Sequence, residues 1–423
     1  MSKQFKHLIF ITAIGGAFEL FDFAIFLHFS SYLAEVFFPP ESGLGGMMSV
    51  LVIFAVSYVA RPVGGVVFSH FGDKIGRRSL FIVSLICMTG ATLGIALLPG
   101  WHAIGIAAPL LLAFFRIVQG MSFGGEVPAA YIFVAEHVDK RQRGLVTARI
   151  CAGCEVGVIM GAVAGALLTT VLTHDEIVNW GWRIPFFAGC VLGVVGYELR
   201  KRTIETPVFI EMLKLVKKQR VPVLTLFLNY KKAMILGVGI TAVTGAMSAV
   251  QLMLPVYLDV TPAFKMHITS AFWVTALFSL ICTLMSLFIG QISDRWGRRF
   301  LVIVGTSLVI PVGFLAQYML VQNIEGAIWF FVIGLSLTSS IVLCSFACAI
   351  LELFPTEVRY SGLAVSYNLG FALFCGLGPM VQNKLLQLTD MAPFYILTTG
   401  AFITLIAALS VSPKHKESLI TIK

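Results

Sequence analysis

Long apolar runs constrain the fold of this chain more than any other feature of its sequence. Several of them reach about 20 residues, the length at which an α-helix crosses a hydrocarbon layer roughly 30 Å thick. A bilayer interior offers no water to backbone N–H and C=O groups, and a helix satisfies those groups within the segment. Only 12% of the 423 residues are charged, against about 25% in soluble domains. The sequence therefore predicts an all-α membrane protein.

Twelve apolar segments are predicted to be transmembrane helices. Their approximate ranges are 8–37, 47–71, 79–99, 103–136, 145–171, 182–200, 231–259, 265–291, 300–321, 324–354, 361–387 and 392–413. An even number of spans places the two termini on the same side of the membrane. The first segment is too long for the apolar part of a cleavable signal peptide and contains Glu19 and Asp22, so we expect it to stay in the protein.

The basic residues predict the orientation of the chain in the membrane. Most of the 30 Lys and Arg residues lie at the two termini or in the connections that follow the even-numbered spans. Because cytoplasmic loops carry the excess of Lys and Arg, both termini and these connections are predicted to be cytoplasmic. The same rule accounts for the formal net charge of +9, so we expect membrane lipid around the protein and no nucleic-acid partner. The predicted location is a bacterial inner membrane.

One long polar connection, at about residues 201–230, divides the predicted spans into six and six. We therefore predict two pseudo-symmetric six-helix halves at 1–200 and 231–413, with a cytoplasmic linker at 201–230 and a short cytoplasmic tail at 414–423. Within the linker, Glu205 to Arg220 is expected to form an amphipathic helix on the membrane surface, with a plain solvated linker as the alternative.

A charged motif occurs twice, once in each predicted half. Gly72-Asp73-Lys74-Ile75-Gly76-Arg77-Arg78 follows the second span, and Ser293-Asp294-Arg295-Trp296-Gly297-Arg298-Arg299 follows the eighth. A second pair of acidic and basic residues, with the same spacing in both copies, follows the fourth and the tenth spans. Repeated halves are typical of transporters that bind their substrate between the two repeats.

These repeated charges predict a gate on the cytoplasmic side. An Asp at the end of one helix can pair with an Arg, or with the positive N-terminus of a neighbouring helix, and such pairs separate when the two halves move. The alternative is an ordinary positively charged loop. The predicted gate residues are Asp73, Arg77, Arg78, Glu136, Arg143, Asp294, Arg298, Arg299, Glu352 and Arg359.

The repeated loop resembles the Gly-Asp-x-x-Gly-Arg-Arg signature of the major facilitator superfamily. Other motifs resemble those of its metabolite:proton symporters, namely Glu19-Leu20-Phe21-Asp22-Phe23, Arg61-Pro62-Val63-Gly64-Gly65, Arg116-Ile117-Val118-Gln119-Gly120 and Pro355-Thr356-Glu357-Val358-Arg359. The resemblance extends over nearly the whole chain. It implies the proton-coupled uptake of a small metabolite, of the kind represented by proline, betaine, α-ketoglutarate, citrate and shikimate, by a protein that works as a monomer.

Two departures from the family pattern concern the substrate. Leu20 and Phe21 stand where the family usually has Trp and Tyr. The fifth span carries Arg149, Cys151 and Glu155, where mostly neutral residues and a Gln are expected. These changes leave room for a substrate that is larger or partly cationic.

Ionisable residues inside the predicted spans indicate function, because a charge in the bilayer costs several kcal/mol. Glu19 and Asp22 lie three residues apart on one helical face. A buried carboxylate can change its protonation with the conformation, so we expect one of the two to carry the coupling proton. Arg61 or Arg116 is expected to bind a substrate carboxylate through its guanidinium fork. The alternative is that these four residues form a neutral structural network.

The ionic residues are concentrated in the predicted N-terminal half, since no Asp, Glu, Lys or Arg lies deep in spans seven to twelve. We expect Glu155 to help select the substrate. Gln251, Tyr367 and Asn368 are expected to supply neutral substrate contacts from the C-terminal half, with packing as the alternative for each.

Other classes of function find little support in the sequence. The chain has no P-loop, HExxH or GxSxG motif, so neither an ATP-driven pump nor an enzyme is predicted. The eight Cys residues lie in apolar segments without a second ligand pair, so no metal site is predicted, and protons replace a cofactor. The prediction is a proton-coupled transporter that imports a small organic acid or zwitterion by alternating access. The alternatives are a proton-driven exporter of a larger or partly cationic metabolite, and a receptor that binds a ligand on a transporter scaffold without transporting it.

Overall fold

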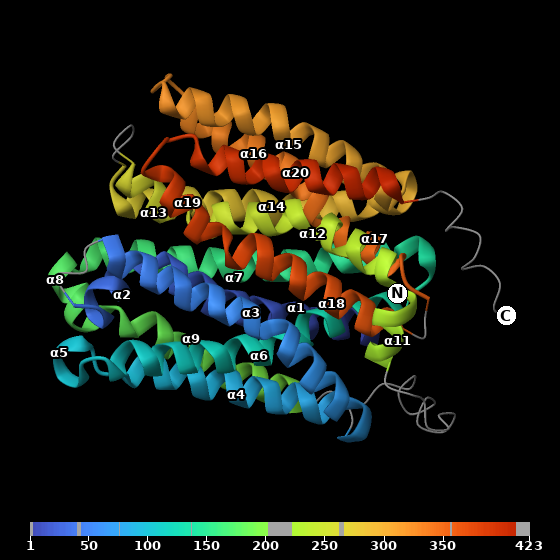
Figure 1. Ribbon diagram of the computed structural model, residues 1–423, viewed down its shortest axis with the longest axis horizontal. Coiled ribbons are helices and arrows are strands. Elements are labelled where there is room, and N and C mark those ends of the chain that lie inside the picture. The colour runs from blue at the N-terminus through green and yellow to red at the C-terminus, as the bar shows by residue number, and fades with distance from the viewer. Residues whose placement is uncertain are drawn as a thin grey trace.

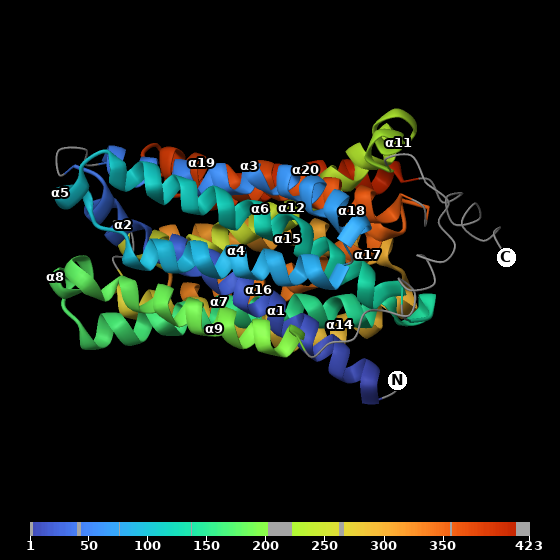
Figure 2. The same ribbon diagram turned by 90° about the horizontal axis from the view of Figure 1, so that it is seen from below.

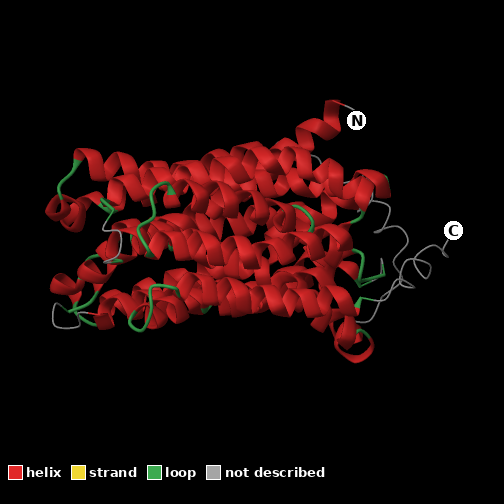
Figure 3. Ribbon diagram, turned by 90° about the horizontal axis from the view of Figure 1, so that it is seen from above, coloured by secondary structure: helices red, strands yellow, loops and turns green. Residues whose placement is uncertain are grey.

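The structure, a computed structural model, describes residues 3–39, 44–75, 77–136, 138–201, 222–261, 266–355 and 358–411. Nearly all of these residues are helical, and the helices form one elongated bundle with their axes roughly aligned (Figure 3). The described part contains no strand. The all-α fold class predicted from the apolar runs is therefore confirmed.

The first group of helices, called here the N-terminal helices, extends from α1 to α9. Its members are α1 Lys3–His28, α2 Ser30–Phe37, α3 Leu44–Ile75, α4 Arg77–Leu97, α5 Trp101–Ile104, α6 Ala107–Glu136, the 3-10 helix η2 Lys140–Gln142, α7 Arg143–Val171, α8 His174–Glu176, the π-helix η3 Ile177–Gly181 and α9 Arg183–Lys201.

The second group, called here the C-terminal helices, extends from α12 to α20. Its members are α12 Lys231–Leu252, α13 Leu254–Val260, α14 Ile268–Trp296, α15 Arg298–Val321, α16 Ala327–Leu343, α17 Phe346–Leu351, α18 Arg359–Phe371, the π-helix η4 Ala372–Gly376, α19 Gly378–Leu386 and α20 Ala392–Ser410. A short helix, α11 Pro222–Asn229, precedes the group and falls within the predicted linker. The amphipathic helix expected at Glu205 to Arg220 lies outside the described residues.

Ten helices of the described part are long and apolar enough to cross a membrane. The bent pair His174–Gly181 and Arg183–Leu199 adds an eleventh candidate, and α4 contributes a shorter apolar stretch, Ile82–Leu97. The helices agree with the predicted ranges to within a few residues, apart from short breaks near residues 29, 105, 253, 344 and 377. Large apolar side chains such as Leu110 and Val171 are exposed on the outside of the bundle, where lipid would cover them.

The two groups of helices lie side by side along the length of the bundle (Figure 1, Figure 2). α7 packs against α14 on one side of the interface, and α3 packs against α18 and η4 on the other. α1 begins and α20 ends at the same end of the bundle, which we call the terminal end (Figure 1). α5 and α8 lie at the opposite end, which we call the distal end.

Glycines let α3 and α6 approach closely and so position the buried residues of both helices. A Cβ at Gly120 would lie 1.9 Å from the carbonyl oxygen of Ser57, and a Cβ at Gly124 would lie 1.9 Å from that of Arg61. Only glycine is compatible with such contact, as is common where membrane helices cross. At the terminal end, Gly297 has a φ of 95°, a value that favours glycine, and α15 begins directly after it.

Candidate functional site

Buried charge is confined to the N-terminal helices in the described part of the chain. The buried Asp, Glu and Arg side chains there are Glu19, Asp22, Arg61, Arg116, Glu126 and Glu155. The C-terminal helices bury neutral polar residues instead, among them Gln251, Gln317 and Asn368. The structure therefore shows the unequal distribution of buried charge between the two groups of helices that the sequence predicted.

Asp22 lies on α1, enclosed by other N-terminal helices. Its Oδ2 accepts hydrogen bonds from Thr92 Oγ1 on α4 and, at 3.3 Å, from Gln119 Nε2 on α6. Gln119 Nε2 also donates to Thr92 Oγ1 at 2.8 Å, so the three side chains form a closed triangle. On a further side, a Cβ at Gly189 of α9 would lie 2.5 Å from Asp22 Oδ1. The carboxylate is therefore held inside the N-terminal helices.

Arg116 lies on α6, one turn before Gln119, and extends this network. Its Nη1 donates to Gln119 Oε1 at 2.9 Å, and its Nη2 donates to Ser57 Oγ on α3 at 3.3 Å. The guanidinium carbon also lies 4.2 Å from the ring centre of Phe26 and 4.5 Å from that of Phe23. A cation over an aromatic face gains about 0.5–2 kcal/mol. Arg116 is thus engaged within the protein.

Arg61 lies on α3 inside a box of aromatic rings. Its guanidinium carbon is 3.4 Å from the ring centre of Tyr58, 3.9 Å from that of Phe123 and 4.2 Å from that of Phe23. The side chain is buried, and its Nε and Nη2 have no hydrogen-bond partner among the described residues. These two N–H groups point to the same side of the guanidinium, which is the fork that a carboxylate accepts with its two oxygens. Arg61 therefore presents a pair of parallel donors that no described residue accepts.

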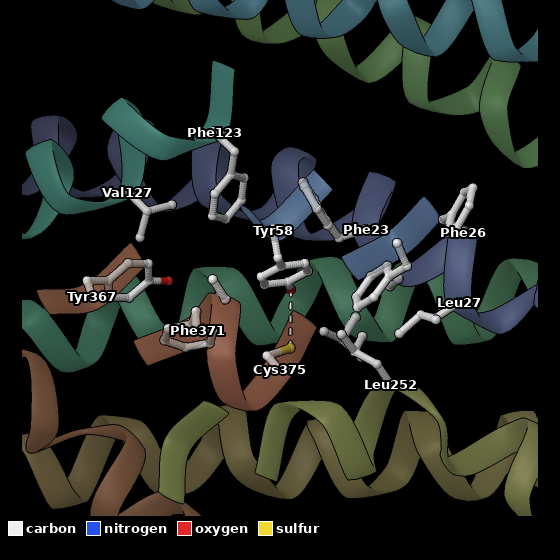
Figure 4. Close-up of a cluster of buried hydrophobic side chains, with 14 of the residues drawn as sticks. Phe23, Phe26, Leu27, Tyr58, Phe123, Val127, Leu252, Tyr367, Phe371 and Cys375 are labelled. Carbon is white, nitrogen blue, oxygen red and sulfur yellow. Dashed lines mark hydrogen bonds between the residues drawn. The ribbon is translucent and has the colours of Figure 1, made fainter. Parts of the chain in front are cut away.

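The aromatic box lies at the interface between the two groups of helices. Figure 4 shows Tyr58 and Phe123 from the N-terminal helices close to Tyr367, Phe371 and Cys375 from the C-terminal helices. Cys375 Sγ donates a hydrogen bond to Tyr58 Oη at 3.3 Å, and the rings of Tyr367 and Phe371 lie 4.5 Å apart. A molecule bound at Arg61 would therefore touch both groups.

Tyr131 on α6 connects the aromatic box to α7. Its ring centre lies 6.2 Å from that of Tyr367, and its hydroxyl lies 3.0 Å from Cys151 Sγ. Cys151 Sγ contacts the backbone oxygen of Leu343 on α16 at 3.1 Å. Glu155 lies four residues further along α7, on the same helical face as Cys151.

Glu155 makes direct contact with the C-terminal helices. Its Oε2 accepts a hydrogen bond of 2.7 Å from Gln251 Nε2 on α12. Gln251 Nε2 also donates to Ser279 Oγ on α14 at 2.9 Å. Three helices from the two groups therefore meet at this carboxylate, and the structure brings the predicted residues Glu155 and Gln251 together.

Three further buried polar residues, Asn368, Glu19 and Glu126, lie on α18, α1 and α6. Asn368 Nδ2 donates to the Gly124 backbone oxygen at 2.7 Å, which links α18 to α6 beside Arg61. Asn368 Oδ1 has no hydrogen-bond partner in the described part. Glu19 is buried on α1, and Glu126 accepts a hydrogen bond of 3.1 Å from Ser84 Oγ on α4.

Asp294 joins the two groups of helices at the terminal end of the bundle. Its Oδ1 accepts a hydrogen bond from Gly144 N at 2.8 Å, and its Oδ2 accepts one from Leu145 N at 2.9 Å, in the first turn of α7. Negative charge is favourable at a helix N-terminus. Arg298 contacts Asp294 at 2.8 Å and Glu352 at 3.3 Å, and it also donates to the Lys140 backbone oxygen.

The remaining predicted gate residues divide into three sets. Arg359 and Glu136 form an ion pair across the interface at 3.9 Å. Arg143 donates to the Ala135 backbone oxygen, and Arg299 donates to backbone oxygens at the end of α20, so each of these contacts stays within one group. The side chains of Asp73, Arg77 and Arg78 lie outside the part of the chain that the structure describes.

The interface is also closed at the distal end. Thr269 Oγ1 on α14 donates to Thr169 Oγ1 on α7 at 3.0 Å. The ring of Phe272 on α14 lies 5.8 Å from that of His28 and 6.1 Å from that of Phe29. Contacts between the two groups of helices therefore occur at both ends of the bundle and in its middle.

Several residues of the site were not given roles from the sequence. Thr92, Gln119 and Ser57 complete the network of Asp22 and Arg116, and Ser279 completes that of Glu155. Gln119 follows Arg116 by three residues, and this helical spacing was the available signal. Thr92 and Ser279 carry no such signal, because their partners are distant in the sequence. No group of three His, Cys, Asp or Glu in the described part is placed to hold a metal ion.

Comparison with known proteins finds relatives along the whole chain. The family model described as Major Facilitator Superfamily matches residues 12–379 and 242–421. The proline/betaine transporter of Salmonella typhimurium is 29% identical over 98% of this chain and 85% of its own length. The inner membrane metabolite transport protein YhjE of Escherichia coli is 31% identical over 96% of this chain and 94% of its own length. The ectoine/proline transporter ProP of Corynebacterium glutamicum is 31% identical over 99% of this chain and 86% of its own length.

Solved structures with the same fold include sugar transporters. A crystal structure of a D-xylose-proton symporter superimposes with a TM-score of 0.75, covering 97% of this chain and 98% of that one at 17% identity. The proton:xylose symporter XylE bound to 6-bromo-6-deoxy-D-glucose also gives a TM-score of 0.75, covering 96% of this chain and 94% of that one at 15% identity.

Proposed function

Because the chain belongs to the Major Facilitator Superfamily and is a multi-pass transporter of the bacterial inner membrane, we propose that it imports a small organic acid or zwitterion together with protons. Proline, betaine and ectoine appear in the names of its relatives and represent this class of substrate. Proton coupling agrees with the names of the solved structures that share its fold. The transport cycle is alternating access of one central site to the two sides of the membrane.

The observation that carries the proposal is the fork of Arg61, whose Nε and Nη2 have no hydrogen-bond partner among the described residues. Burying a guanidinium in the membrane interior costs several kcal/mol, and within the described part of the chain no hydrogen bond to these two N–H groups offsets that cost. A substrate carboxylate would satisfy both. Arg61 stacks on Tyr58, whose hydroxyl accepts a hydrogen bond from Cys375 of the C-terminal helices, and this position supports substrate contact from both groups. Arg116 would serve mainly to hold the network of Asp22.

Asp22 is the proposed proton carrier. Its carboxylate is buried and accepts hydrogen bonds from neutral groups. One of these groups, the Gln119 amide, is also hydrogen-bonded to Arg116. Protonation would remove its charge and change the hydrogen bonds of Gln119. Gln119 lies on α6, the helix that also provides Phe123 to the aromatic box around Arg61. Glu19, nearby on α1, is the second candidate for this role.

The proposed topology has twelve spans and cytoplasmic termini. It divides the chain into halves at 1–200 and 231–413, a linker at 201–230 and a tail at 414–423. The terminal end of the bundle would then be cytoplasmic, in keeping with its basic residues. The contacts of Asp294, Arg298 and Arg359 would form part of the cytoplasmic gate. The protein would work as a monomer within membrane lipid, with a small-molecule substrate and no enzymatic activity.

Uptake by purified protein in liposomes tests the proposal. An inward proton gradient should drive accumulation of at least one member of a panel that contains proline, glycine betaine, α-ketoglutarate, citrate and shikimate. The Asp22→Asn variant should lose gradient-driven accumulation but keep exchange of substrate across the membrane, because a permanently neutral side chain cannot carry a proton.

A matched control is Asp259→Asn, which neutralises an exposed carboxylate on α13 and should leave transport unchanged. Gradient-driven accumulation that persists in Asp22→Asn would exclude Asp22 as the carrier. Outward movement of substrate against its gradient would instead assign the protein to export. Binding without flux in either direction would assign it to a receptor.

A further inference from the structure

We propose that Glu155 recognises the cationic nitrogen of a zwitterionic substrate, and that it prefers a nitrogen that still carries hydrogens to one that is fully methylated. The inference rests on the proposed function, because it specifies the substrate for the same interface. It concerns a residue that departs from the expected family pattern in the fifth span.

Glu155 has no cationic partner among the residues that the structure describes. The side chain is buried, and its hydrogen-bonding neighbours are neutral, namely the amide of Gln251 and the hydroxyl of Ser279. None of the ion pairs in the described part includes it. An ionised carboxylate removed from water is strongly disfavoured unless a cation and hydrogen bonds compensate it. A positively charged group of the substrate would supply this compensation when it binds.

The position of Glu155 places such a cation between the two groups of helices. Asp22 and Glu126 accept hydrogen bonds from side chains of the N-terminal helices. Glu155 instead accepts its hydrogen bond from α12, next to Ser279 of α14. A substrate cation at Glu155 would therefore contact both groups, as a transported molecule must.

The aromatic box cannot take the cation of the substrate, because a protein cation already fills it. The guanidinium of Arg61 lies over the rings of Tyr58, Phe123 and Phe23. A quaternary ammonium ion is usually bound by such ring faces. Here the guanidinium of Arg61 already lies over these ring faces, and its positive charge would repel a second cation. We therefore expect the carboxylate of a zwitterion to bind at Arg61 and its nitrogen to bind at Glu155.

The hydrogen-bonding groups around Glu155 explain the preference for a nitrogen with hydrogens. A carboxylate offers several acceptor positions, and the Ser279 hydroxyl oxygen can accept as well. A primary or secondary ammonium group can donate to these oxygens. A fully methylated nitrogen brings the same charge but no donor, so the acceptors that it covers lose hydrogen bonds.

Binding measurements on purified protein in nanodiscs test the inference with two matched sets of compounds. The first set is proline, N,N-dimethylproline and cyclopentanecarboxylate. The second is 4-aminobutyrate, its trimethylammonium analogue and pentanoate. In at least one set, the ammonium form should bind wild-type protein at least about tenfold more tightly than the other two forms. A factor of this size corresponds to the loss of one hydrogen bond to a charged group. In Glu155→Gln, the three forms of that set should agree within about threefold.

Glu126→Gln is the matched control, because it neutralises another buried carboxylate and should keep the wild-type preference. Glu155→Asp retains the charge and should keep part of the preference, so it distinguishes lost recognition from lost folding. The inference is overturned if the quaternary ammonium forms bind as tightly as the forms whose nitrogen carries hydrogens, or if the preference survives in Glu155→Gln. Proton-driven uptake is measured separately, and its absence for every compound would reject the proposed function instead.

Discussion

The side chain of Gln119 forms hydrogen bonds with both Asp22 and Arg116 and so connects them. The amide oxygen of Gln119 accepts from Arg116 Nη1 at 2.9 Å, and its nitrogen donates to Asp22 Oδ2 at 3.3 Å. The amide therefore uses both of its ends, and its orientation is fixed by the charges on either side. A proton on Asp22 would weaken one end of this connection and leave the guanidinium of Arg116 with less compensation.

Replacing Gln119 with Leu should disconnect the proton site from Arg116. Both charged groups would lose a hydrogen bond inside the bundle, and we expect a loss of stability of about 1–3 kcal/mol. Substrate binding at Arg61 should persist, while the dependence of uptake on the proton gradient should fall markedly. Uptake measured at several external pH values checks this expectation. Gln322→Leu, at the distal end of α15, serves as the control, and an unchanged pH profile in Gln119→Leu would contradict the proposed connection.

Replacing Arg61 with Lys should weaken the binding of carboxylates about tenfold or more, because an ammonium group cannot present two parallel donors to one carboxylate. The Lys side chain would also lose the planar contact with the rings of Tyr58 and Phe123. Equilibrium binding of the transported substrate is the measurement. Arg299→Lys is a matched change at the terminal end, where the guanidinium donates to backbone oxygens of α20, and it should leave the affinity unaltered. Equal affinities in wild type and Arg61→Lys would remove Arg61 from the binding site.

Replacing Gly124 with Ala should disrupt the bundle. The new Cβ would lie 1.9 Å from the carbonyl oxygen of Arg61, and the neighbour is backbone that cannot move away cheaply. Overpacking of this kind typically costs about 1–3 kcal/mol or more. Gly90→Ala provides the control, because a Cβ there meets nothing within 4 Å. Thermal unfolding in detergent should show a lower midpoint for Gly124→Ala alone, and similar midpoints for the two variants would argue against this helix contact.

Replacing Asp294 with Leu should loosen the terminal end of the interface. The amides of Gly144 and Leu145 would lose their acceptor, and each hydrogen bond to a charged group contributes about 1.5–3 kcal/mol. Hydrogen exchange of a peptide that contains both amides should accelerate. Exchange at the distal end should stay the same, which provides an internal control. Unchanged exchange at Gly144 and Leu145 would show that other contacts hold this end closed.

A cysteine pair at Thr169 and Thr269 should lock the distal end. The two hydroxyl oxygens are 3.0 Å apart across the interface, so sulfur atoms that replace them would lie close enough to react with each other. Oxidation of the double variant T169C/T269C should stop transport, and a reductant should restore it, because alternating access requires the two groups to separate there. Each single variant serves as a control. Full activity of the oxidised, cross-linked protein would contradict a cycle in which the distal end opens.

Much of the fold could be predicted because membrane helices are specified locally. A run of apolar residues satisfies its own backbone and covers itself with side chains that suit lipid, so α3, α7 and α14 lie where the sequence placed them. The repeated motif likewise gave Asp294 a position at a helix end. Its partners, the amides of Gly144 and Leu145, could not be predicted, because they belong to a distant helix.

The sequence by itself determined that this protein is an all-helical membrane transporter with its charges concentrated in one group of helices, since hydropathy and charge act residue by residue. The tertiary structure alone decided what each charge meets. It enclosed Asp22 with Thr92 and Gln119 and set Glu155 against Gln251. It also placed the fork of Arg61 among aromatic rings, with no hydrogen-bond partner in the described residues. These differences arise because hydrogen bonds and ring contacts form between helices far apart in the chain, over distances that only packing can fix.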